Sequence, residues 1–185
     1  MSRNTLSLLL VIVFFVQNSA FAQDARLKDI IVTNTQEDLL LYLNVEGAFN
    51  EKMKMAVLSG VPTSFSFFVS LYRVRNLWFD EKITDVTVTN TVKYDNLKEE
   101  FTIIRSWEKS GPRVSKSFDE AKKLITEIDG LKIVSLVQLK KNHRYQLRTK
   151  AELSKVTLPY YLHYILFFVS LWDFETDWYA IDFIY

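Results

Sequence analysis

Hydrophobic and polar residues alternate along most of this chain with the two-residue period of a β-strand whose two faces meet different surroundings. The alternation is clearest over residues 84–94, where valines and a tyrosine point one way and threonines, an aspartate and a lysine point the other. Other segments repeat this pattern or are rich in β-branched and aromatic residues. We expect strands over residues 26–33, 38–45, 62–75, 84–94, 100–107, 132–139, 143–153 and 172–185, the last with a bulge near Asp177 where its phase changes.

Short polar connections between these segments indicate hairpins, which join neighbouring strands in antiparallel pairs. The turn "NTQE" joins the first two strands, "YDNLK" joins 84–94 to 100–107, and "KKN" joins 132–139 to 143–153. The sheet content should therefore be mainly antiparallel.

A helix with a complete set of end signals is predicted over residues 119–128. Ser117 and Glu120 have the spacing of a capping box, and Gly130 provides a stop at the other end. Phe118, Leu124, Ile125 and Ile128 follow at helical spacing and should dock the helix on the core.

A second, shorter helix is expected over residues 50–60, capped by Asn50 and ended by Gly60. Pro159 would suit the first turn of a third. The fold class that follows is mainly β (α+β): an antiparallel β-sandwich or partly open barrel of about eight strands with two or three short helices.

Two nearly identical hexapeptides, "FFVSLY" at 67–72 and "FFVSLW" at 167–172, raise the question of a repeat. Their flanking sequences differ, so we interpret the match as coincidence in an aromatic-rich chain. The first reads as a strand. The second ends an uncharged run, 156–172, that is shorter than the roughly 20 residues of a spanning helix. We predict that residues 160–172 are a buried element, with peripheral membrane contact as the alternative.

The first 22 residues have the features of a secretory signal peptide. Arg3 precedes the apolar run "LSLLLVIVFFV", and Ala20 and Ala22 form an A-x-A cleavage signal. We expect cleavage after Ala22 and a single exported domain over residues 23–185, in the periplasm of a Gram-negative type of bacterium. The exported part would carry 22 basic and 22 acidic residues, a balance that does not favour nucleic acid as a partner.

Catalytic and metal-binding motifs are not apparent in the sequence. With no cysteine, disulfides and thiol chemistry are excluded. His143 and His163 have no partners at metal-ligand spacing, and Asp173, Glu175 and Asp177 read as a solvated strand face. We therefore expect no cofactor and no enzymatic activity.

A pair of arginines is the most distinctive polar feature. Arg73 and Arg75 end the apolar face of the strand that contains "FFVSLY". Two side chains of this kind could bind a carboxylate or phosphate in bidentate fashion. The alternative is a structural role, with ion pairs to Asp80 or Asp95 at the rim of a sheet.

An ordered series of segments resembles a known family. The series runs "GVPTSFSFFVSLYRVRNLWFD", "VKYDNLKEEF", "YQLRTKAELSKVTLPYYL" and "SLWDFETDW", and it spans nearly all of the chain after residue 22. It is similar to the bacterial exported family called domain of unknown function 4390. The residues that match its pattern are Gly60, Pro62, Arg73, Arg75, Trp78, Tyr94, Asp95, Leu147, Arg148, Leu158, Pro159, Trp172 and Trp178.

The resemblance implies a signalling partner, because genes of this family are often neighbours of membrane-bound sensor kinases. One hypothesis is an exported domain that binds a sensor kinase or another envelope protein. The other is a binding protein for a small apolar or acidic ligand held between aromatic walls. The candidate binding residues are Arg73, Arg75, Trp78, Asp95, Arg148 and Trp172.

Overall fold

Two antiparallel sheets form the protein in the computed structural model, which describes residues 25–153 and 175–185. The smaller sheet has the strand order β1-β2-β7, and the larger has the order β6-β5-β4-β3-β8-β9. The smaller sheet consists of β1 (Arg26–Asn34), β2 (Asp38–Glu46) and β7 (Glu127–Ser135). The larger consists of β3 (Thr63–Arg73), β4 (Glu81–Asp95), β5 (Glu100–Arg105), β6 (Arg113–Ser115), β8 (Arg144–Leu153) and β9 (Tyr179–Ile184).

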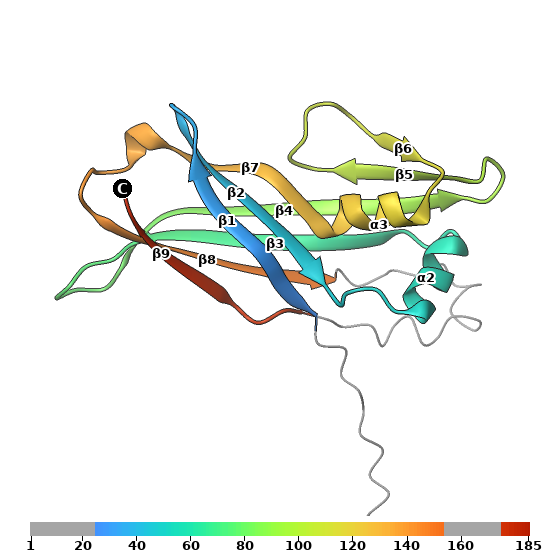
Figure 1. Ribbon diagram of the computed structural model, residues 1–185, viewed down its shortest axis with the longest axis horizontal. Coiled ribbons are helices and arrows are strands. Elements are labelled where there is room, and N and C mark those ends of the chain that lie inside the picture. The colour runs from blue at the N-terminus through green and yellow to red at the C-terminus, as the bar shows by residue number, and fades with distance from the viewer. Residues whose placement is uncertain (1–24, 154–174) are drawn as a thin grey trace, which may run out of the picture.

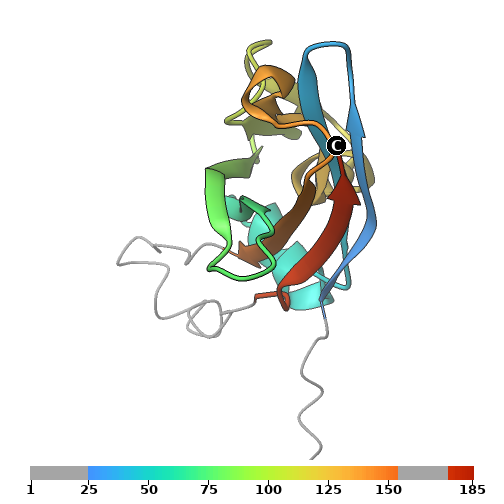
Figure 2. The ribbon, with the colours of Figure 1, turned by 90° about the vertical axis from the view of Figure 1, so that its left-hand side faces the viewer.

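The sheets face each other in a sandwich-like arrangement that is not closed into a barrel. Figure 2 shows the larger sheet curving around the interior and the β1–β2 hairpin closing another side. Two short α-helices, α2 (Glu51–Leu58) and α3 (Phe118–Thr126), and the 3₁₀ turn η1 (Leu136–Gln138) complete the described part (Figure 1). The predicted mainly β, antiparallel fold is confirmed.

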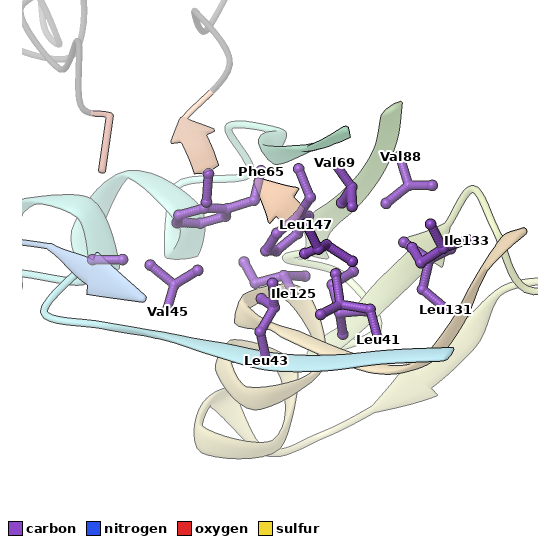
Figure 3. Packing of buried hydrophobic residues seen from close by; sticks show 14 of the residues in the cluster. Leu41, Leu43, Val45, Phe65, Val69, Val88, Ile125, Leu131, Ile133 and Leu147 are labelled. Carbon is purple, nitrogen blue, oxygen red and sulfur yellow. The ribbon is translucent and has the colours of Figure 1, made fainter. Parts of the chain in front are cut away.

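The core is built from the alternate residues that the sequence pattern assigned to one face of each strand. Leu41 from β2, Phe65 and Val69 from β3 and Leu147 from β8 are at most 1% exposed and point toward one another between the sheets (Figure 3). Ile125 of α3 reaches the same interior. Burial of this continuous apolar surface is the main force that holds the two sheets together.

The outer face of the larger sheet is polar with interspersed aromatic rings. Serines of β3 face threonines of β4 across the pair, as in the 2.7 Å hydrogen bond between the Ser64 and Thr91 hydroxyl groups. Phe68 and Tyr72 interrupt this serine row. "FFVSLY" is thus a half-buried strand, as predicted.

The predicted helix over 119–128 is too long, and its predicted stop is wrong. α3 ends at Thr126, and residues 127–135 are strand β7. Gly130 lies inside β7 with φ +79°, at a register shift opposite Tyr42. The bulge at this position suits glycine, because L side chains rarely adopt such a positive φ and a Cβ atom here would lie 3.3 Å from the Tyr42 hydroxyl group.

The predicted hairpin around "KKN" is also wrong. β7 pairs with β2 in the smaller sheet, whereas β8 pairs with β3 and β9 in the larger. The segment between them, including η1, carries the chain from one sheet to the other. The hairpins predicted around "NTQE" and "YDNLK" are confirmed as β1–β2 and β4–β5.

Several predictions fall on residues 1–24 and 154–174 and so lie outside the described residues. They are the signal peptide, the helix at Pro159 and the buried element at 160–172. Of the strand predicted over 172–185, the described part contains β9 and, before it, a single bridge between Glu175 and Glu152. Within residues 25–153 and 175–185, no helix is long and apolar enough to cross a membrane.

Candidate functional site

The turn between β3 and β4 projects beyond the end of the sheets (Figure 1). Its outermost residues are Leu77, Trp78 and Phe79, which are 96%, 73% and 86% exposed. The rings of Trp78 and Phe79 meet edge to face with 6.3 Å between their centroids. Three consecutive large apolar side chains in water are unusual on a small domain and mark a surface that another molecule could cover. We call residues 74–80 the aromatic tip.

An ion-pair cluster fixes the base of this tip. The carboxylate of Glu81, the first residue of β4, accepts hydrogen bonds from the guanidinium groups of both Arg73 and Arg75. Arg73 lies at the end of the inner face of β3, and its side chain is only 13% exposed. Hydrogen bonds from the two arginines, with Arg75 the larger contributor, hold the pKa of Glu81 below its ordinary value, although desolvation opposes them.

Arg148 braces the tip from the opposite face of the sheet. It lies on β8 across from Ser70, with its guanidinium carbon 4.6 Å from the centroid of the Tyr72 ring. Its Nη2 atom lies 3.5 Å from the carboxylate of Asp80, and its Nε donates to Gln146 at 2.6 Å. Asp80 and Glu81 therefore tie arginines from both faces to the start of β4.

Asp95 lies at the other end of β4, away from these arginines. Its carboxylate accepts from the backbone N–H groups of Leu97 at 2.9 Å and Lys98 at 3.1 Å. These bonds, the one from Lys98 first, lower the pKa of Asp95. The residue shapes the β4–β5 turn. Arg73, Arg75, Trp78 and Arg148 thus gather in one place, Asp95 does not, and Trp172 lies outside the described residues.

A shallow pocket of about 410 Å³ lies beside Arg148 on the outer face of the larger sheet. Tyr72 and Trp178 form its aromatic walls, with Ser70 and Ala180 between them. Next to it, the Lys150 ammonium group lies 5.3 Å from the ring centroids of both Phe68 and Trp178. A cation above an aromatic face is attracted by the ring quadrupole, so Lys150 helps to fix the positions of the Phe68 and Trp178 rings.

A buried polar network is the feature that our sequence reasoning missed. The Asn90 side chain, in the middle of β4, is fully buried and donates toward the carbonyl groups of Ile125 at 3.3 Å and Glu127 at 3.2 Å. Its oxygen accepts from the Trp107 ring N–H at 3.1 Å. A signal existed: Asn90 is the one polar residue in the inward series of residues 86, 88, 90, 92 and 94.

Arg105 completes this network from β5. Its side chain is 3% exposed, pairs with Glu108 at 2.7 Å and donates to the Glu127 carbonyl at 2.9 Å. The guanidinium carbon lies 4.3 Å from the centroid of the Trp107 ring. Burial lowers the pKa of Arg105, and the nearby charge of Glu108 opposes that effect. The network ties the end of α3 and the start of β7 to the larger sheet.

The described part of the chain contains no group of three or more histidine, aspartate or glutamate side chains that could hold a metal ion. Its distinctive surface is instead an aromatic tip on a braced hairpin. Together, fold and site define a sandwich-like β-domain that exposes three large apolar side chains at one end. The chain belongs to the family described as Domain of unknown function (DUF4390), which matches residues 22–182. The family resemblance drawn from the sequence is thereby confirmed. Neither curated proteins nor solved structures yielded a match.

Proposed function

We propose that this protein is a non-catalytic domain of the bacterial cell envelope that binds another envelope protein through the aromatic tip. The observation that carries the proposal is the exposure of Leu77, Trp78 and Phe79 on a hairpin whose base is held by three arginines. Tryptophan and arginine are over-represented among the residues that dominate protein–protein binding energy.

The bracing of the tip supports this role. A protruding loop that must be ordered on binding loses conformational entropy, which weakens association. Here Glu81 and Asp80 restrict the strands on both sides of residues 74–80 before any partner arrives. A prearranged apolar surface of this kind keeps more of its contact energy as affinity.

The proposed cellular setting is supported by the sequence. The predicted signal peptide over residues 1–22 supports export, and the resemblance to a family whose genes neighbour sensor kinases supports the outer domain of such a kinase as the partner. Burial of residues 160–172 within the domain stays a prediction, and contact of their aromatic side chains with lipid stays the alternative to it.

Binding of a small acidic ligand is a second candidate, favoured by the pocket between Tyr72, Trp178 and Arg148. A ligand carboxylate there would compete with Asp80 for Arg148, which the 3.5 Å separation of that pair permits. Calorimetric titration with short-chain carboxylates tests this candidate. Heat of binding that disappears in Arg148→Gln and persists in Arg144→Gln would support it.

The tip proposal is tested by photo-crosslinking in living cells. A photoreactive phenylalanine derivative replaces Trp78 in one strain and Leu97 in another. Leu97 is the matched control because it is 97% exposed and apolar but lies in the β4–β5 turn, at the opposite end of the molecule (Figure 1). We expect a defined adduct with one envelope protein from position 78 only. Identical adducts from both positions, or adducts with lipid alone, would contradict the proposal.

A further inference from the structure

The larger sheet lacks a strand at one position. β4 is 15 residues long, but β5 pairs only with its second half, from Asn90 to Asp95. On that side, no strand among the described residues accompanies the first half of β4, although β3 pairs with it on the other side. The part of β4 that precedes Thr89 therefore remains an open sheet edge on this side among the described residues.

The backbone groups of this edge can be identified. In an antiparallel strand, alternate residues direct their N–H and C=O groups to opposite neighbours. Thr89 exchanges bonds with Ser106 on the β5 side: its N–H donates to the Ser106 hydroxyl at 2.8 Å and its carbonyl accepts from Ser106 N–H at 2.9 Å. By this alternation, Thr87 and Asp85 direct their backbone groups to the same side, where the described part of the chain supplies no partner strand.

A cleft of about 800 Å³ occupies that position. Val86 and Val88 of β4 form one wall, and Leu131 and Ile133 of β7 form the facing wall. Trp107 closes the end where β5 leaves β4. The cleft therefore offers unpaired backbone N–H and C=O groups of β4 beside apolar walls. β-Strand addition recognises an extended peptide through this combination.

The rim of the cleft is predominantly basic. Lys109, Arg113 and Lys132 line it against a single acidic residue, Glu108. Arg113 is bound to Glu108 at 2.9 Å, and Lys132 to Asp38 at 2.7 Å. Lys109 is exposed, and no ion pair to it occurs within the described residues. The remaining charge favours an acidic group on whatever enters the cleft.

We propose that this cleft binds an extended segment of a partner protein, which adds a strand to β4 in line with β5. The segment has apolar side chains at alternate positions, on the same sheet face as Val86 and Val88, and an acidic residue beside Lys109. The β7 edge is a poorer template, because register shifts at Leu39/Leu40 and Leu41/Tyr42 bulge this strand against β2. This site is separate from the aromatic tip, and either can be present without the other.

The test starts with the chain purified from cells and a display library of random peptides about ten residues long, enough for one strand. We expect selected peptides to alternate apolar and polar residues and to carry acidic flanks. Each is then measured against Thr87→Pro and Thr87→Val. Proline deletes the edge N–H while β3 keeps its own hydrogen bonds, whereas valine keeps the N–H and replaces only the side-chain hydroxyl group by a methyl group. Thr87→Pro should bind about tenfold more weakly than Thr87→Val, and Lys109→Glu should also weaken binding.

Amide exchange of the unaltered protein provides a measurement that does not depend on the folding of a variant. The Thr87 amide should exchange quickly in the free protein and slowly in the peptide complex. Equal binding by the proline and valine variants, selected peptides without alternation, or an empty selection would overturn the proposal. A Thr87 amide already protected in the free monomer would assign the cleft to another segment of this chain. A concentration-dependent dimer lost in Thr87→Pro would assign it to a second copy, and both results would also overturn the proposal.

Discussion

Asn90 shows how one residue can decide where elements of this fold end and meet. The last carbonyl groups of a helix have no partner within the helix and must find one elsewhere. In α3, which passes into β7 without an intervening loop, Asn90 donates to the Ile125 carbonyl and Arg105 to the Glu127 carbonyl. These side chains take the place of the glycine-type stop expected from the sequence.

Asn90→Ala should lower the free energy of unfolding by about 1–3 kcal/mol, since it leaves buried carbonyl groups and the Trp107 N–H without their partner. Denaturant titration measures the loss. Asn76→Ala, in the exposed tip, is the control and should change stability by less than about 0.5 kcal/mol. Equal effects of the two substitutions would show that the buried network contributes nothing.

Glu81 makes stability depend on pH through the arginine cluster. Hydrogen bonds from Arg75 and Arg73 lower its pKa in the folded protein from the ordinary 4.5. Its contribution is therefore complete above the unfolded-state pKa and disappears as the pH falls through the lower folded-state value. Glu81→Gln should reduce stability at neutral pH and flatten the loss of stability on acidification.

Chemical unfolding at a series of pH values between neutral and acid measures this effect. Glu99→Gln is the matched control, because Glu99 is an exposed carboxylate in the β4–β5 turn with no ion pair among the described residues. A Glu81→Gln profile parallel to that of the unaltered protein would rule out the linkage.

At the scale of single residues, sequence reasoning located the two arginines at the end of their strand but not the partners that they bind. The position of Arg73 and Arg75 at the end of an apolar strand face was visible in the pattern, but the ion pairs expected with Asp80 or Asp95 are wrong, because both arginines bind Glu81. That Asp80 would bind Arg148, and Glu81 the other two arginines, depends on which strands become neighbours. A single sequence does not contain that information.

At the scale of elements, α3 depends on a cap at its start and on one buried contact near its end. The Ser117 hydroxyl accepts from the Glu120 N–H at 3.4 Å, while the Glu120 carboxylate accepts from Ser115 instead of closing the expected capping box. Of the residues predicted to dock the helix, Ile125 is fully buried, and Phe118 and Leu124 are half-buried against the core. Ile128 is buried but belongs to β7.

Ile125→Ala should cost about 2–5 kcal/mol of unfolding free energy, because a cavity replaces a side chain in the core. Leu124→Ala should cost clearly less, since solvent already reaches that residue, and Ser117→Ala about 1 kcal/mol. The midpoints of denaturant titrations give all three values. A larger loss for Leu124→Ala than for Ile125→Ala would mean that the other face of α3 meets the core.

The elements were predicted better than their pairing. Alternation is a local property, so β3, β4 and β8 could be located from the sequence. The "KKN" hairpin failed because a short polar connection is compatible both with a hairpin and with a crossing between sheets. The strand β6 was missed because its three residues are too few to show a period.

At the scale of the whole molecule, the residues that stabilise the fold and the surface proposed for binding lie in different places. The core and the Asn90 network lie between the sheets, whereas the aromatic tip extends past the end of both (Figure 1). The tip side chains gain little from folding, since they are almost as exposed as in an unfolded chain. Selection for stability alone does not explain a tryptophan and a phenylalanine there.

Replacing Leu77, Trp78 and Phe79 together by serine should therefore leave the protein folded and equally stable, within about 1 kcal/mol. The same change should remove most of its affinity for apolar surfaces, because it removes three exposed apolar side chains from a single projecting turn. Thermal melting measures the first effect, and retention on a hydrophobic-interaction column measures the second.

Leu97→Ser provides the control, since it deletes an equally exposed side chain from the opposite end of the molecule. A triple variant that melts many degrees lower would show that the tip packs against the domain. A triple variant that is retained as long as the Leu97→Ser protein would mean that another surface governs apolar contact, and the aromatic tip would no longer support the proposed function.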